Sequence, residues 1–202
     1  MVISGKKGIV SKRISEIVSL CRRKGIMTIV HGFYNPCTIE LDEETGVGSP
    51  YETYAFGSQI VEVAVDVETG EVEALHIYAA HDVGKAVNPL QVDAQIEGGC
   101  IQGLGYAIYE EIKKEGGKIT IPSFSTYLIP IAMDMPEIHS IIVEEPSNNG
   151  PFGVKGLGES ALVPTAAAIA NAVYDAIGVR IYSLPITPEK VLQALQQKNN
   201  KQ

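Results

Sequence analysis

The sequence lacks tryptophan and contains only three cysteines, Cys21, Cys37 and Cys100. Their odd number and wide spacing provide neither a disulfide framework nor a cysteine pair for a metal ion. Disulfides persist mainly in oxidising compartments. We therefore expect reduced thiols and a cytoplasmic protein.

Long apolar runs and an excess of basic residues are also missing. No signal-peptide stretch follows Lys6 and Lys7, and no segment has the roughly 20 apolar residues needed to span a bilayer. The 16 basic residues are outnumbered by 24 acidic ones, which gives a net charge of -8. Nucleic acids and anionic membranes attract basic surfaces, so we expect neither as a partner.

What remains is the composition of a globular chain. Of the 202 residues, 45% are hydrophobic and 20% are charged, so the chain can bury a core without disulfides. No internal repeat divides it. We interpret residues 1–202 as a single domain, with a polar tail over residues 196–202 that is expected to fray.

The first half of the chain predicts a helix, a loop and a hairpin. Apolar residues at three- and four-residue steps predict a helix over residues 11–24. Residues 34–58 are rich in turn formers and predict a long loop. Alternating valines predict a strand over residues 61–67, and a turn at residues 68–70 leads to a second strand over residues 72–80.

The second half mixes helices and short strands. Helices are predicted over residues 89–112 and 164–177, and a last helix begins at Pro188 with Thr187 as its cap. Strands are predicted over residues 118–121, 138–143 and 179–184. The elements do not alternate strictly, which favours an α+β fold with mainly antiparallel strands over a doubly wound sheet.

The helix predicted over residues 89–112 contains glycines that each cost roughly 1 kcal/mol relative to alanine. Gln95 and Gln102 are seven residues apart and share a helix face, with Gly98, Gly99 and Gly105 on or near it. Such a face allows a flat, heteroatom-rich ligand to approach the backbone between two amides. Close packing against another helix or strand is an equally good explanation.

A second unusual segment, residues 150–160, surrounds Lys155 and Glu159 with glycines. A backbone of this kind bends tightly and can turn N–H groups inward. Glu159 stands five residues before Pro164, and a carboxylate held in such a loop can serve as a general base. The alternative is a solvated loop glutamate near a helix N-terminus.

Other motifs are weaker. The four histidines are scattered, and His76 and His81 are five residues apart, which suits no common metal pair. We expect surface or core roles for the histidines and predict no metal ligand on this chain. No phosphate-binding loop is present, and no Ser-His-Asp set can be argued from spacing.

Taken in order, the motifs resemble a known family. Six segments are similar in order and spacing to the molybdenum hydroxylases of the xanthine dehydrogenase and aldehyde oxidase type. They are residues 51–57, 82–89, 95–99, 102–105, 125–130 and 156–159. The resemblance covers roughly residues 45–195. It implies the C-terminal part of a molybdenum-binding subunit, present either as a fragment or as a naturally split small subunit.

The resemblance also implies a chemistry. The family uses molybdenum on molybdopterin, in some members as the cytosine dinucleotide, to insert water-derived oxygen at an electron-poor carbon of an N-heterocycle or aldehyde. It implies that Glu159 is the catalytic general base and that Gln95 and Gly158 bind the cofactor. Supporting roles are implied for residues that match neighbouring motif positions, namely Asp82, Asn88, Gln102 and Lys155.

Partners follow from what the chain lacks relative to the family. Molybdenum subunits of this type are several times longer, and no iron–sulfur or flavin motif is present here. The remainder of the molybdenum subunit and partners carrying iron–sulfur clusters and FAD are therefore expected, and the isolated chain is expected to be inactive. The alternatives are a non-catalytic assembly module and an unrelated small-molecule binding domain.

Overall fold

The computed structural model describes residues 2–5 and 8–200, which form two compact units, Met1–Asn35 and Pro36–Gln202. In the first unit, strands β1 (Val2–Gly5) and β2 (Gly8–Ser11) pair antiparallel and precede helix α1 (Ile14–Arg23). The helix predicted over residues 11–24 is thereby confirmed. Gly25, at φ 66°, follows its end. Residues 36–56 of the second unit are loop apart from an isolated bridge between Ile39 and Ser49.

The predicted hairpin is confirmed as strands β3 (Gly57–Val65) and β4 (Val72–Asp82), which pair antiparallel. Strand β3 begins four residues earlier than predicted, and Val67 belongs to the turn. The side chain of Asp66 closes that turn by accepting hydrogen bonds from the N–H groups of Glu68 at 2.7 Å and Thr69 at 3.1 Å. Such local bonds from aspartate are typical of turns.

Strand β7 (Glu137–Val143) pairs parallel with β4 and completes a sheet of order β3-β4-β7. A further short hairpin joins β5 (Lys114–Glu115) and β6 (Lys118–Ile119). Among the strand pairs in the described chain, only β4–β7 is parallel. The prediction of an α+β fold with mainly antiparallel strands is therefore confirmed.

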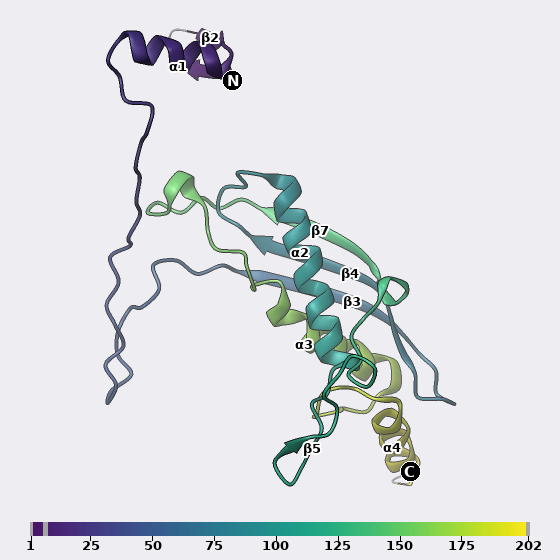
Figure 1. Cartoon of the computed structure of the whole chain (residues 1–202). Helices are drawn as coiled ribbons and strands as arrows, with labels where there is room; N and C mark the ends of the chain where they lie inside the picture. The colour runs from purple at the N-terminus through teal and green to yellow at the C-terminus, as the bar shows by residue number, and fades with distance from the viewer. Residues whose placement is uncertain (1, 6–7, 201–202) are drawn as a thin grey trace. The chain divides into compact units, whose positions relative to one another are not determined.

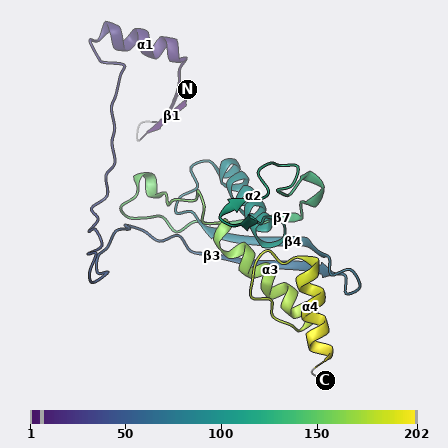
Figure 2. The same ribbon diagram turned by 60° about the horizontal axis from the view of Figure 1, so that its bottom comes forward.

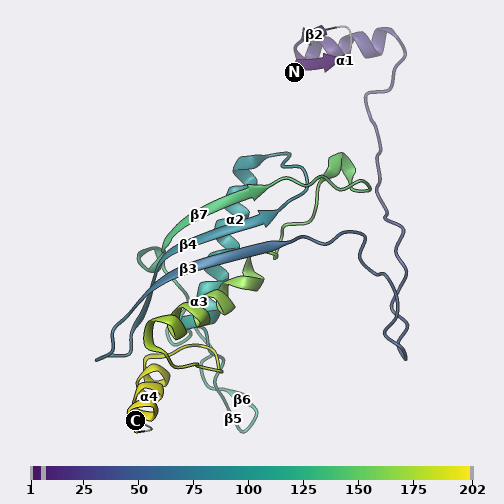
Figure 3. The same ribbon diagram turned by 180° about the vertical axis from the view of Figure 1, so that it is seen from behind.

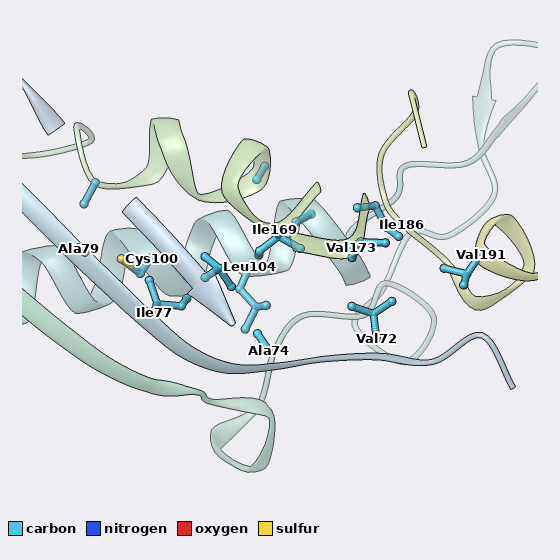
Figure 4. Close-up of a cluster of buried hydrophobic side chains, with 14 of the residues drawn as sticks. Val72, Ala74, Ile77, Ala79, Cys100, Leu104, Ile169, Val173, Ile186 and Val191 are labelled. Carbon is cyan, nitrogen blue, oxygen red and sulfur yellow. The ribbon is translucent and has the colours of Figure 1, made fainter. Parts of the chain in front are cut away.

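Helices α2 (Pro89–Leu104) and α3 (Leu162–Ile177) lie side by side against one face of the sheet. Helix α2 crosses over the strands in Figure 1 and lies behind them in Figure 3. The core fills the space between these layers, and Figure 4 shows its side chains converging from the strands and both helices. Its fully buried members include Ile77, Ile96, Leu104 and Ile169.

Helix ends follow local chemistry. The Asn88 side chain accepts a hydrogen bond from the Gln91 N–H and caps α2. A π-helical turn, η1 (Gly105–Tyr109), extends α2. The helix predicted to Ile112 therefore stops three residues early. Helix α3 starts two residues earlier than predicted and ends at Gly178, whose φ of 67° fits a left-handed cap.

The strand predicted over residues 179–184 is wrong, since these described residues are irregular. Val179, Ile181 and Leu184 pack against the core instead of joining a ladder, so their apolar character reflects burial. Short 3-10 turns η2 (Ala132–Asp134) and η3 (Pro151–Gly153) complete the loops.

Helix α4 (Pro188–Asn199) begins as predicted, with the Thr187 hydroxyl accepting from the Lys190 N–H. It continues to Asn199, four residues into the tail expected to fray, and residues 201–202 lie outside the description. Figure 2 shows α4 next to α3, where Lys198 Nζ donates to the carbonyl of Ile177 at 2.8 Å.

None of the helices in the described part of the chain is both long and apolar enough to cross a membrane. The assignment of residues 1–202 to a single domain stays a prediction.

Candidate functional site

Gln95 projects from the exposed side of α2 toward the glycine-rich loop. Its amide Nε2 donates a hydrogen bond of 2.7 Å to the carbonyl oxygen of Gly158. Two segments that are 63 residues apart in sequence are thereby joined at the residue preceding Glu159. The structure thus brings together the three residues that the sequence pattern singled out, Gln95, Gly158 and Glu159.

The loop is also fixed to the end of strand β4. An isolated bridge pairs Gly84 with Val154, and the Lys155 N–H donates to the carbonyl of Val83 at 3.0 Å. Lys155 Nζ lies 2.5 Å from Asp82 Oδ2, and the two side chains are only 10% and 8% exposed. Asp82 and Lys155 therefore anchor the base of the loop.

The carboxyl group of Asp82 is held ionised by this contact. Burial alone would raise its pKa, but hydrogen bonds from Lys155 and the Gly84 N–H, with the positive charge of Lys155, outweigh burial and lower the pKa below its ordinary value.

A polar network holds the turn that follows Glu159. The Leu162 N–H donates to the Glu159 carbonyl at 3.1 Å. Gln59 on β3 donates to the Ala161 carbonyl at 2.8 Å, and the Thr165 hydroxyl donates to Gln59 Oε1 at 2.7 Å. The backbone two residues beyond Glu159 is therefore tied to the sheet.

The same Gln59 amide reaches two further buried groups. Its Nε2 lies 3.1 Å from His81 Nε2 and 3.4 Å from Cys100 Sγ. Burial is the main cause that lowers the pKa of His81 and raises the pKa of Cys100 to about 11. A neutral imidazole and a protonated thiol therefore surround the amide.

An open pocket of about 470 Å³ lies between η1 and the start of α3. It contains two carboxylates, Glu159 and Glu110. Glu110 accepts a 2.6 Å hydrogen bond from the Tyr127 hydroxyl, which raises the pKa of that hydroxyl. The remaining lining residues are Gln102, Tyr106, Leu162, Val163 and Ala166.

The glycines of α2 have different roles. Apart from its chain neighbours and the backbone of its own helix, no heavy atom of the described residues lies within 4 Å of a Cβ built on Gly98, so this position is open for a ligand. A Cβ on Gly99 would lie 2.7 Å from Ala161 Cβ, and one on Gly103 would be closer still to Thr165. Gly99 and Gly103 therefore serve the close packing of α2 on α3, which was the alternative explanation for the glycines.

The geometry fits a pterin-type ligand at this edge. The hydroxyl of Ser160 is buried, and no other described residue offers it a hydrogen-bond partner. Cβ atoms on Gly156 and Gly158 would also meet open space within the described chain. Open backbone, an orphaned hydroxyl and the Gln95 amide together suit a flat ligand with many donors and acceptors.

Sequence reasoning missed several of the residues at this site. Gln59 is the clearest case, because it occupies an inward-facing position of β3 in line with Val61 and Val63. A polar residue at an apolar position of a strand was the available signal. The sequence contained no signal for Tyr106 and Glu110, because the π-helical turn η1 brings them to the pocket.

Comparisons with known proteins agree with this geometry. Residues 2–136 match the family model described as the molybdopterin cofactor-binding domain. The chain is 39% identical over 147 residues to the 6-hydroxypseudooxynicotine dehydrogenase complex subunit gamma of Paenarthrobacter nicotinovorans, covering 71% of this chain and 18% of the relative. It is 35% identical over 156 residues to the putative xanthine dehydrogenase molybdenum-binding subunit of Escherichia coli K12, covering 76% and 21%.

A solved structure of the same family is also similar to this chain. The aldehyde oxidoreductase from Desulfovibrio gigas superposes with a TM-score of 0.73 at 38% identity, covering 79% of this chain and 17% of that one. The chain thus spans about a fifth of the length of the relatives it matches. The family model covers well over half of the chain, and the 202-residue chain therefore belongs to the molybdopterin cofactor-binding domains of the molybdenum hydroxylases, the family of xanthine dehydrogenase and aldehyde oxidoreductase.

Proposed function

We propose that this chain forms one wall of the active site of a molybdenum-dependent hydroxylase, with Glu159 as the general base. The observation that carries the proposal is the hydrogen bond from Gln95 to the carbonyl of Gly158. This bond ties Gln95 to the residue that precedes Glu159, and Glu159 lines the open pocket of about 470 Å³. When bound, the molybdenum cofactor supplies the oxidation–reduction chemistry of the reaction.

The chain's own residues have separate tasks in this proposal. Gln95 and the open backbone at Gly98 and Gly158 hold the pterin, in its plain or cytosine dinucleotide form. The Glu159 carboxylate accepts the proton released when water-derived oxygen is added to an electron-poor carbon of an N-heterocycle or aldehyde. Such proton transfer by a positioned base contributes about a hundred- to ten-thousand-fold to a rate.

The complete enzyme requires further protein. The chain spans about a fifth of its relatives, and one relative is named as a complex subunit. We therefore place the rest of the molybdenum subunit, the iron–sulfur clusters and FAD on other segments or partners, in the cytoplasm. The 202-residue chain alone is expected to retain no stoichiometric molybdenum.

The test of the base is Glu159→Gln in the complete enzyme, with turnover and molybdenum content measured on the same sample. Glu110→Gln is the matched control, because Glu110 lines the same pocket but is engaged by Tyr127. We expect Glu159→Gln to lose at least about a hundredfold in turnover at normal metal content, and Glu110→Gln to lose far less.

Turnover within a few-fold of wild type in a fully loaded Glu159→Gln enzyme would contradict the assigned role. It would leave the non-catalytic assembly module as the better explanation. Cofactor binding is tested separately by Gln95→Ala and Gly98→Leu, which should both lower molybdenum occupancy while the variants stay folded.

A further inference from the structure

Two histidines and a glutamate that are scattered in the sequence meet on the sheet. Strands β4 and β7 run parallel, and their register pairs His76 with Glu137 and Tyr78 with His139. Ile77 and Ile138, which alternate with these residues, belong to or pack against the core. His76, Tyr78, Glu137 and His139 therefore project from the sheet face opposite α2, which is the face turned forward in Figure 3.

We propose that His76, Glu137 and His139 form a binding site for a divalent transition-metal ion, with zinc as the best match. Imidazole nitrogens and a carboxylate oxygen are the ligands that zinc takes in three-ligand protein sites, which leave a fourth position open to water. No function proposed above uses these residues, and no site residue named above belongs to this cluster.

The spacing of the donor atoms fits such an ion. His76 Nδ1 lies 3.5 Å from Glu137 Oε2, and His139 Nε2 lies 3.6 Å from Glu137 Oε1. One donor atom from each residue can be chosen so that all three lie within 4.8 Å of one another. In a tetrahedral site with bonds of about 2.0–2.1 Å, neighbouring ligand atoms are separated by about 3.3 Å. The cluster therefore needs only small side-chain movements to close on an ion.

The surroundings of the His76 imidazole support the proposed metal site. His76 Nδ1 is shielded from solvent, and none of the described residues forms a hydrogen bond with it. Buried polar nitrogens without a partner are rare, because they lose the hydrogen bonds that water would provide. In the tautomer that leaves Nδ1 unprotonated, this nitrogen, 3.5 Å from Glu137 Oε2, is available to a metal.

Neighbouring rings stack against the second histidine, His139. The Tyr78 ring stacks on His139 with centroids 4.5 Å apart and an interplanar angle of 10°, and the two histidine rings lie 5.8 Å apart at 25°. Turning both ring nitrogens toward one ion requires rotation about χ2, which is a broad, soft torsion for histidine. The histidine side chains are 35% and 38% exposed, so an ion can enter from solvent.

An ion at this position would join β7, an edge strand of the sheet order, to the central strand β4. Because ligands that bind only the folded state stabilise it, zinc should raise the thermal unfolding midpoint of the chain. This gives a readout that is independent of any enzymatic activity and of the molybdenum cofactor.

The experiment uses the full 202-residue chain with Cys21 and Cys37 replaced by serine, so that accessible thiols cannot bind the probe. Zn²⁺ binding is measured by competition with a chromophoric chelator, and thermal unfolding is followed with and without Zn²⁺. We expect one Zn²⁺ per chain. His76→Ala, Glu137→Gln and His139→Ala should each weaken binding at least tenfold and remove the thermal shift.

His31→Ala is the matched control, because His31 is exposed and lies outside the cluster. It should bind Zn²⁺ like the parent chain. Circular dichroism without metal confirms that each variant folds. Absence of saturable one-to-one binding would overturn the proposal, and so would unchanged affinity in the folded His76→Ala and His139→Ala variants.

Discussion

Two adjacent glycines in α2 provide the sharpest test of how this fold is packed. Gly98 is exposed and Gly99 is buried. We predict that the same substitution, glycine to alanine, has different effects on the free energy of unfolding at these two positions. Both lie inside one regular helix, so the intrinsic gain in helix propensity, about 1 kcal/mol, is common to both variants.

The magnitude follows from what the new methyl group meets. At Gly98 it meets no described heavy atom within 4 Å outside its own stretch of helix, whereas at Gly99 it would lie 2.7 Å from Ala161 Cβ and 3.2 Å from the backbone nitrogen of Leu162. Carbon atoms prefer separations of about 3.5–4.0 Å. The Ala161 methyl is attached directly to the backbone, so the start of α3 must move by roughly 1 Å relative to α2.

Overpacking of this kind costs about 1–3 kcal/mol. Gly98→Ala should therefore stabilise the chain by up to about 1 kcal/mol, and Gly99→Ala should be less stable than Gly98→Ala by about 1–3 kcal/mol. Because the propensity gain cancels, the difference between the variants measures the contacts of the Gly99 methyl with Ala161 and Leu162 at the start of α3.

The assay is urea unfolding of the 202-residue chain followed by circular dichroism, with wild type, Gly98→Ala and Gly99→Ala measured in parallel. Equal unfolding midpoints for the two variants, at equal denaturant dependence, would refute the packing argument. Equal midpoints would also mean that Gly99, like Gly98, leaves room for a ligand to approach the helix.

Three further predictions concern the buried polar groups. Lys155→Met leaves Asp82 buried without its partner and should destabilise the chain by about 3–5 kcal/mol at pH 7. Because the folded pKa of Asp82 is lowered, the ion pair stabilises the folded chain at pH values above the unfolded pKa of about 3.9. The difference in stability from wild type should therefore shrink as the pH falls through the folded pKa. Gln59→Leu should cost about 1–3 kcal/mol in urea unfolding, since its buried hydrogen-bond partners lose their contacts; stability equal to wild type would contradict the network. Burial raises the pKa of Cys100 to about 11, so iodoacetamide at pH 8 should modify the exposed Cys37 in the folded chain and Cys100 only in denaturant, as mass spectrometry of peptides would show.

The sequence by itself determined the elements whose signals are local. Alternating valines and the turn at residues 68–70 predict the β3–β4 hairpin, and the Thr187 cap predicts the start of α4. These signals act within a few residues, so they can be recognised without the fold. The ordered glycine and glutamine motifs likewise identified the family resemblance. The structure brings Gln95, Gly158 and Glu159 together.

Contacts between distant segments were decided only by the tertiary structure. The parallel pairing of β4 with β7 brings His76 beside His139, although 62 intervening residues separate them in the sequence. The close approach of α2 and α3 assigns Gly99 to packing and Gly98 to open surface, which helix periodicity could not distinguish. Apolar residues such as Ile181 indicate burial but not whether a strand is available for pairing. Register and packing depend on every element at once, and for that reason no local pattern specifies them.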